Sequence, residues 1–455
     1  MDPNSESLSK KLKIGWAIGE VGVAAFIGTT MIFFLFFLTE AIGMPPVLAG
    51  VTLLIPRIWD AIVDPVIGAV SDRTRSRAGR RRPYILAGTL TLGPLFALMF
   101  WVPGGLGDWG KVVYVTVVYL LASTAYSVFD VPYSAMAAEM TGDYAGRTSL
   151  VSYKEIAARI GIVASVIVAP VIFTSQSTLA SGFRILGLAG GAFITLTFLV
   201  TFLTTRSVRS HQTASAPFSV REEFEAIAHN RPFRTLWLVF LLQNIAIGAS
   251  STTLVYLITF VMRADAKAAG PLLAISSIIG VFVTPLWAIV SRRFGKRSGY
   301  FLALAIVAAM SLPALAIPAS VYQLLFVVLL VAGIGDAGAQ LLSGSMVPDT
   351  VEVEELRTGA RREGAIFGAW IFCRKLGMAV GAFLVSIDLS LFGFVEGAPV
   401  GQQSPTALLG IRLTYCLLPF VLYLLATAVL ARYDLSEERF NELKRRIAVK
   451  PRAAG

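Results

Sequence analysis

Cysteine and histidine are scarce in this sequence of 455 residues, which contains two of each. Both cysteines, Cys373 and Cys416, lie in apolar segments, so we expect neither a disulfide framework nor a thiolate metal site. The two histidines, His211 and His229, fall in one polar loop and form no metal-binding cluster. These absences leave no metal partner to expect other than a hard cation, such as Na⁺, held by oxygen atoms.

Catalytic motifs are also lacking. No pairing of a nucleophile with a general base stands out, and no loop has the pattern of a nucleotide-binding site. Gly333, Gly335 and Gly338 are too few for a phosphate-binding loop, and they lie within an apolar run. The sequence therefore predicts neither an enzyme nor a bound cofactor.

Charged residues make up only 15% of the chain, whereas 56% of it is hydrophobic. Apolar runs of about 20 residues, the length that spans a bilayer, recur from end to end. A soluble chain of this length would instead form domains with polar surfaces. We therefore predict an all-α membrane protein with twelve transmembrane helices, at residues 14–39, 47–70, 84–103, 111–139, 153–174, 183–205, 233–262, 270–291, 299–317, 322–347, 365–395 and 408–432.

The net charge of +11 lies largely in short loops between the apolar runs, which argues against a nucleic-acid partner. Basic loops alternate with loops that contain no lysine or arginine, and the loop with Arg263 and Lys267 is the one exception. This alternation places both termini in the cytoplasm. Residues 1–13 are polar and no cleavage site follows the first run, so we expect no removable signal peptide. The basic loops are 71–83, 206–234, 291–297, 357–362 and 432–452.

A long polar stretch divides the spans six and six. We predict an N-terminal bundle at 1–205, a cytoplasmic linker at 206–232, a C-terminal bundle at 233–435 and a cytoplasmic tail at 436–455. Within the linker, 221–229 has the pattern of a short amphipathic helix on the membrane surface. The basic turn at 68–84 is repeated at 287–300. Two halves related in this way, with the site near the middle of the membrane, are an arrangement found in transporters.

Two carboxylates and an arginine interrupt the second apolar run. A charge at the centre of a bilayer helix costs about 2.5–3.5 kcal/mol. Asp60 and Asp64 are four residues apart, so they share one helix face and repel each other. Such a pair is tolerated in the membrane if a proton, a sodium ion or a basic side chain binds reversibly between the two carboxylates. The alternative is permanent salt bridges to Arg57 and Lys375. We favour a cation-coupled transporter.

Several motifs resemble those of a known family. The turn with Asp72 and 80–82 resembles the signature of the major facilitator superfamily. The sequence RIWDAIVDPVIG resembles the second-span motif of the glycoside–pentoside–hexuronide:cation symporters. Further matches are 126–132 (YSVFDVP), the acidic and basic turn 346–364, and Lys375 in span 11. The resemblance implies a major facilitator fold of two six-helix halves.

The resemblance also implies roles for individual residues. Asp60 and Asp64 would bind Na⁺ or H⁺, with the hydroxyl of Ser127 nearby. Asp130 would link the cation site to the sugar site, although an aspartate before Pro132 also fits a helix kink where it caps freed backbone donors. Oxygen ligands of this kind suit a hard cation.

Some family features are missing. The family's sugar-binding aspartate in span 1 corresponds to Ala24, and the nearest acid is Glu20, one turn earlier. Glu20 either replaces that aspartate in part or is solvated near the cytoplasmic end. The family's aromatic residue after the span-4 motif is Ser134 here, preceded by Tyr133, and another in span 10 is Gln340. The solute therefore stays open. Our candidate solute-binding residues are Glu20, Tyr126, Asp130, Tyr133, Asp336, Gln340, Trp370 and Lys375.

Other polar residues have two interpretations each. Asp336 and Gln340 share one helix face and either line the cavity or join helices. Trp370 either stacks on the solute or faces lipid. Lys375 needs an aspartate partner, and Arg374 points about 100° away from it along the helix. A cytoplasmic charge cluster either gates the cavity by ion pairing or sets the topology; its members are Asp72, Arg80, Arg81, Asp349, Glu355, Arg361 and Glu363.

We therefore expect a monomeric symporter in a bacterial inner membrane, in contact with lipid, that moves a small-molecule solute by alternating access. A sugar or glycoside is the expected solute. One alternative is an amphiphile such as a lysophospholipid, which a distant branch of the family carries. Another alternative is a membrane sensor or scaffold that transports nothing.

Overall fold

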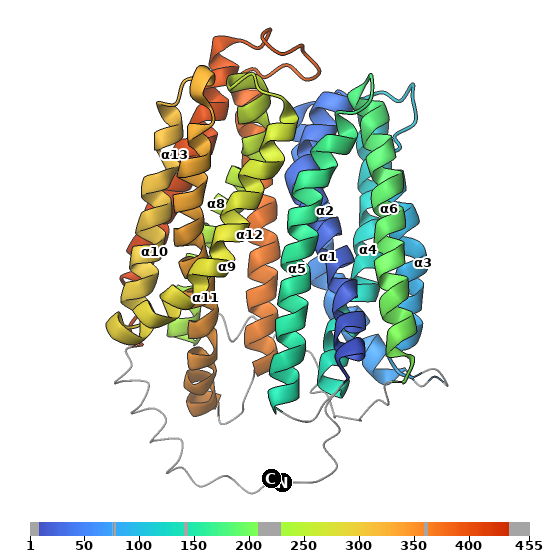
Figure 1. Ribbon diagram of the computed structural model, residues 1–455, viewed down its shortest axis with the longest axis vertical. Helices are drawn as coiled ribbons and strands as arrows, with labels where there is room; N and C mark the ends of the chain where they lie inside the picture. The colour runs from blue at the N-terminus through green and yellow to red at the C-terminus, as the bar shows by residue number, and fades with distance from the viewer. Residues whose placement is uncertain are drawn as a thin grey trace, which may run out of the picture. The chain divides into compact units, whose positions relative to one another are not determined.

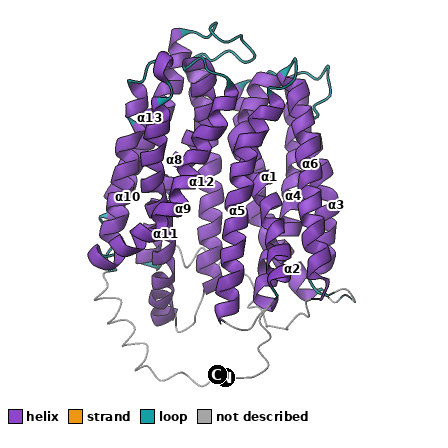
Figure 2. Cartoon of the chain, viewed as in Figure 1, coloured by secondary structure: helices purple, strands orange, loops and turns teal. Residues whose placement is uncertain are grey.

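The computed structural model describes residues 9–74, 76, 79–140, 144–207, 229–358 and 363–435. Within these ranges all regular structure is helical, as Figure 2 shows. Twelve α-helices are described there, and they match the twelve apolar runs of the sequence. They are labelled in Figure 1: α1 (Lys10–Phe36), α2 (Pro46–Arg73), α3 (Arg82–Met99), α4 (Asp108–Met140), α5 (Tyr144–Phe173), α6 (Leu179–Thr204), α8 (Arg231–Tyr256), α9 (Ala269–Phe294), α10 (Lys296–Ser311), α11 (Leu324–Thr358), α12 (Glu363–Leu391) and α13 (Pro405–Leu430).

Eleven helical stretches in the described part of the chain are long and apolar enough to cross a membrane. The twelfth helix, α3, is 18 residues long and begins with arginine, proline and tyrosine, which lower its average hydropathy. Side chains at the helix starts stabilise several of these helices. Ser9 accepts a hydrogen bond from the backbone N–H of Leu12 in α1, and Asn230 accepts one from Phe233 in α8.

The chain forms two compact units. Unit 1 contains α1 to α6 together with the segments Ile258–Pro271 and Phe383–Ala407. In it α1 packs against α5 and α6, α3 packs against α4 and α6, and α2 packs against α4. The predicted linker and surface helix lie largely outside the described residues, and the predicted tail lies entirely outside them. The domain boundaries at 205 and 232 therefore stay predictions.

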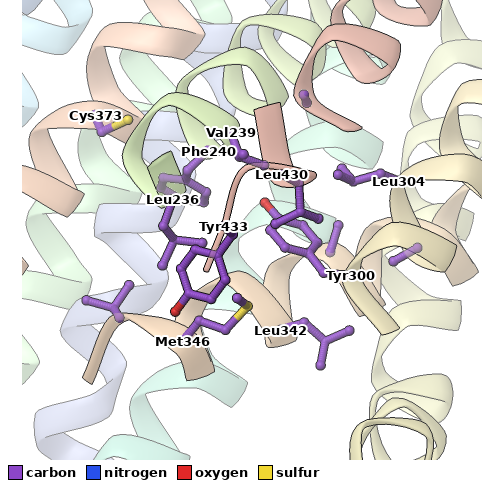
Figure 3. Packing of buried hydrophobic residues seen from close by; sticks show 14 of the residues in the cluster. Leu236, Val239, Phe240, Tyr300, Leu304, Leu342, Met346, Cys373, Leu430 and Tyr433 are labelled. Atoms are coloured by element: carbon purple, nitrogen blue, oxygen red, sulfur yellow. The ribbon is translucent and has the colours of Figure 1, made fainter. Parts of the chain in front are cut away.

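Unit 2 contains the rest of the second half, and in it α11 packs against α10 and α8. Its core gathers apolar side chains from all six helices, α8 to α13, and Figure 3 shows part of it from close by. Cys373 belongs to this core, and Cys416 is also buried with a free thiol. Both cysteines thus pack as small hydrophobic residues.

The first helix of each half ends in the same way. α1 runs into a π-helical turn, Phe37–Ala41, and α8 runs into another, Leu257–Val261. A residue with a left-handed backbone follows each turn: Gly43 with φ 59° and Arg263 with φ 51°. The internal repeat seen in the basic loops therefore extends to the backbone of the first helices.

Candidate functional site

The carboxylate of Asp60 is held at both oxygens. Its side chain is only 1% exposed, and its Oδ2 lies 3.3 Å from Nη1 of Arg57, one helical turn away on α2. Its Oδ1 accepts a hydrogen bond from Oγ of Ser123 on α4. A buried charge needs both a counter-ion and hydrogen bonds, and Asp60 has them.

Asp64 repeats this contact one turn further along. Its Oδ1 accepts a hydrogen bond from Oγ of Ser127 at 2.5 Å. Ser123 and Ser127 are four residues apart on α4, as Asp60 and Asp64 are on α2, so the two helices present matching rows. Both aspartates are therefore directed at α4 within unit 1 and not at lipid. We refer to these four residues as the α2–α4 ladder.

Sequence reasoning selected Ser127 and missed Ser123. A lone serine in an apolar run carries no signal, because such residues often bond only to their own helix. The spacing of four residues between the two serines, equal to that of the aspartates, is the pattern that would have found it.

Asp130 lies at the centre of a second group of polar contacts, three residues beyond the ladder on α4. Its Oδ2 accepts a hydrogen bond from the hydroxyl of Tyr126 at 3.1 Å, and its Oδ1 accepts one from Ser134 at 3.4 Å. Nζ of Lys154 on α5 donates to Oγ of Ser134 at 2.8 Å. Nζ also lies 3.4 Å from Oε2 of Glu20 on α1. We call these five residues the Asp130 network; it connects α1, α4 and α5.

Glu20 is largely buried, since its side chain is 12% exposed, and it is paired with Lys154. Solvation at the cytoplasmic end therefore does not describe its surroundings. Ala24, where the family has its aspartate, is buried against Gly161 of α5, where an added Cβ would come within 2.7 Å of the Ala24 Cβ. Position 24 is therefore part of the close contact between α1 and α5, and the acid of this chain lies one turn earlier. Lys154 itself was missed, because it lies at the very start of its apolar run.

Tyr133 belongs to the core of unit 1. Its hydroxyl donates to the backbone oxygen of Trp16 at 3.1 Å, and the two rings stack with centroids 5.0 Å apart. Nζ of Lys154 lies 5.3 Å from the centroid of the Tyr133 ring, close enough for a cation–π contact. Tyr133 therefore joins Trp16 of α1 to Lys154 of the Asp130 network. Its contact with the solute stays a prediction.

The candidates of the second half lie in unit 2. Trp370 is 7% exposed and stacks on Phe240 with ring centroids 3.7 Å apart, so it packs inside the unit. Asp336, Gln340 and Lys375 are half-buried, and Arg374 is exposed. Their roles, and the partnership of Lys375 with an aspartate of α2, stay predictions.

Two ion pairs are described at the predicted cytoplasmic turns, one in each unit. Nη2 of Arg81 lies 3.0 Å from Oδ1 of Asp72, and Nζ of Lys296 lies 2.6 Å from Oδ2 of Asp349. Lys296 was not among the predicted gate residues. Arg361 lies outside the described residues, as does the side chain of Glu363. Gating by Arg80 and Glu355 stays a prediction.

The polar side-chain atoms of the ladder and the Asp130 network are all oxygens apart from Nζ of Lys154, which carries a positive charge. Among the described residues, no group of three or more histidine, cysteine or acidic side chains could hold a metal ion. Carboxylate and hydroxyl oxygens match the preference of H⁺ and of hard cations such as Na⁺.

Comparison with known proteins identifies the family of this chain. A family model described as MFS/sugar transport protein matches residues 15–437. The chain belongs to this family. It is 29% identical to the uncharacterized symporter YnaJ of Bacillus subtilis, over 98% of this chain and 96% of that protein. It is also 29% identical to the inner membrane symporter YicJ of Escherichia coli, over 94% and 92%.

Other similar proteins carry names that include solutes. The chain is 26% identical to the putative glycoside/cation symporter YagG of Escherichia coli, over 98% of this chain and 96% of that protein. It is 27% identical to the glucuronide carrier protein homolog of the same organism, over 96% and 95%.

Among solved structures, a bacterial homolog of the lysosomal transporter Spinster matches with a TM-score of 0.70 at 14% identity. The match covers 94% of this chain and all of that one. The nucleoside transporter NupG matches with a TM-score of 0.67, also at 14% identity, over 92% and 99%. At these identities the likeness concerns the fold alone.

The predicted family and the all-α major facilitator fold are thereby confirmed. The chain is an integral membrane symporter of this family and not an enzyme.

Proposed function

We propose that this symporter couples the movement of Na⁺ or H⁺ to that of a sugar or glycoside, by alternating access across a bacterial inner membrane. The observation that carries the proposal is the α2–α4 ladder, in which two aspartates of one membrane helix meet two serines of another. The names of similar proteins, which include a glycoside/cation symporter and an inner membrane symporter, support it.

In this proposal the cation binds at Asp64, Ser127, Asp60 and Asp130. Asp60 already has Arg57 as a counter-ion, so its role is to hold the geometry of the ladder and to supply one oxygen ligand to the cation. Asp64 is half-buried and takes the larger share of the cation charge. Neutralising a carboxylate inside the membrane removes a cost of about 2.5–3.5 kcal/mol, which makes occupancy favourable.

The solute binds next to the cation through the Asp130 network. Carboxylate oxygens accept hydrogen bonds from sugar hydroxyls, and Tyr126, Ser134 and Lys154 supply donors. Asp130 is within two turns of both Ser127 and Ser134 on α4, so in this proposal it contacts both the cation and the solute. A cation bound at Asp130 therefore changes the charge of a side chain that the solute contacts. Because such coupling is reciprocal, the cation raises affinity for the solute and the solute raises affinity for the cation.

The test is uptake into proteoliposomes under an imposed Na⁺ or H⁺ gradient, with labelled glycosides in one arm and a labelled lysophospholipid in the other. Asp64→Asn removes a charge and is expected to abolish gradient-driven uptake while leaving the protein folded. Asp60→Asn is also expected to abolish uptake, but it leaves buried Arg57 without its counter-ion, so it is tested beside the charge-matched double variant Arg57→Leu with Asp60→Asn.

The matched control is Asp108→Asn, which removes a carboxylate from an exposed position at the start of α4 and is expected to leave uptake unchanged. Full uptake in both ladder variants would rule out this cation site. Lysophospholipid uptake without glycoside uptake would establish the amphiphile alternative. Absence of flux with every solute would favour a sensor.

A further inference from the structure

We infer that the N-terminal half of this symporter selects neutral glycosides over the corresponding sugar acids, an inference that rests on the proposed sugar symport. The reason is that the cation best placed to meet a solute, Lys154, is already neutralised by Glu20, and the acid beside them is Asp130. Similar proteins carry names of both kinds, a glycoside symporter and a glucuronide carrier, so the charge of the solute is an open choice within the family.

The first step is the engagement of Lys154. Its Nζ lies 3.4 Å from a carboxylate oxygen of Glu20 and donates a 2.8 Å hydrogen bond to Ser134. The side chains of the pair are 23% and 12% exposed, so solvent does little to screen their attraction. An anionic solute could use Lys154 only by taking it from Glu20, which would leave the Glu20 carboxylate buried without its counter-ion.

The second step is the charge of the surroundings. Asp130 is joined to Lys154 through Ser134, so a carboxylate placed beside Lys154 also approaches Asp130. The other buried cation described on α2, Arg57, is engaged by Asp60. Like charges brought together in a poorly solvated site strongly disfavour binding. A neutral sugar avoids this repulsion, because its hydroxyls both donate to the acids and accept from Lys154 and Tyr126.

The third step is the position of the acid. Ala24, where the family has its carboxylate, lies at a close contact with Gly161 of α5. Glu20 is on the same face one turn earlier and reaches Lys154 from there. Glu20 is therefore a specificity-determining residue, since it cancels the charge that an acidic sugar would need.

The experiment compares matched solutes that differ only at C6 of the ring. Phenyl β-D-glucoside and phenyl β-D-glucuronide form one pair, and the two galacto-configured analogues form the other. Each compound competes against labelled uptake, or drives counterflow, in proteoliposomes that contain the full chain. The neutral member of at least one pair is expected to bind at least about tenfold more tightly than its acid.

Glu20→Gln tests the cause. It keeps the size of the side chain and removes the charge that neutralises Lys154, so the preference for the neutral solute is expected to shrink by about tenfold or to reverse. The matched control is Asp108→Asn, which removes an exposed acid at the start of α4; this variant is expected to show the same preference as the unchanged protein.

Several results would overturn the inference. One is a preference of the unchanged protein for the glucuronide or galacturonide; loss of that preference in Lys375→Met would then assign charge recognition to the second half. Another is an unchanged preference in a folded Glu20→Gln variant. If no sugar of either charge competes or drives counterflow, the proposed sugar symport fails and this inference fails with it. Preferred transport of the sugar acid with intact cation coupling would overturn this inference and leave the proposed symport standing.

Discussion

At the scale of single residues, Asp60 and Arg57 form a buried ion pair within α2. Asp60 is 1% exposed and bonded at both oxygens. Removing one partner of a buried pair leaves an uncompensated charge, which is far more costly than removing both partners. The stability of the protein therefore depends on whether the charges remain matched.

Arg57→Leu is expected to lower the free energy of unfolding by about 3–5 kcal/mol, because it leaves the Asp60 charge buried without its counter-ion. The double variant Arg57→Leu with Asp60→Asn is expected to recover most of that loss. Both are measured by denaturant unfolding of the purified protein in detergent. Arg292→Leu, at an exposed position, serves as the control. Equal losses in the single and double variants would contradict the ion-pair interpretation.

The residues that the sequence identified are those that belong to a recognisable motif or that are costly in a membrane. Asp60, Asp64 and Asp130 are charges within apolar runs, and Ser127 and Tyr126 belong to the same short motif as Asp130. Ser123, Lys154 and Lys296 depend on contacts between helices. Nothing local to their own segments says which neighbour they will meet, so these partners had to come from the structure.

At the scale of elements, hydropathy located each membrane helix, but the ends were less well predicted. The fourth span was predicted at 111–139 and the helix is Asp108–Met140; the ninth was predicted at 299–317 and α10 is Lys296–Ser311. Apolar composition marks the part inside the bilayer, whereas helix ends depend on local bonding and on turns. The π-helical turns after α1 and α8 could not be read from composition, because their residues are as apolar as the helices before them.

Two glycines set how closely neighbouring helices approach. An added Cβ at Gly161 of α5 would lie 2.5 Å from the backbone oxygen of Val21 on α1. One at Gly377 of α12 would lie 2.7 Å from Cβ of Asn244 on α8. Each half thus uses a glycine where this pair of helices meets, since any side chain there would overlap the neighbour.

Gly161→Ala and Gly377→Ala are each expected to lower the free energy of unfolding by about 1–3 kcal/mol, the usual effect of overpacking. Gly344→Ala is the matched control: it is an exposed glycine within α11, where an added Cβ meets no atom within 4 Å. The control is expected to raise stability by up to about 1 kcal/mol, since alanine favours the helix. Equal effects at all three positions would mean that helix propensity decides and not close packing.

At the scale of the whole molecule, the two halves repeat in backbone but not in charge. The phrase Asp64-Pro65 in α2 corresponds to Thr284-Pro285 in α9, so the second half has a hydroxyl where the first has a carboxylate. Thr284 donates to the backbone oxygen of Gly280 within its own helix at 2.6 Å. The duplicated scaffold has thus placed its ladder of acids in one half, which supports assigning cation coupling to the N-terminal helices.

The orientation of the chain in the membrane gives the last prediction. Lysine and arginine are concentrated in alternate loops, so the α5–α6 loop is expected to face outward and the α9–α10 turn to face the cytoplasm. Cys373 and Cys416 are buried, so the native thiols are expected not to react, and the unchanged protein serves as the control for labelling. Gln176→Cys places one thiol at an exposed position in the α5–α6 loop, and Arg292→Cys places one at an exposed position in the last turn of α9, next to the α9–α10 turn. In intact cells a membrane-impermeant maleimide is expected to label the first and to label the second only after the membrane is opened; the opposite pattern would invert the topology.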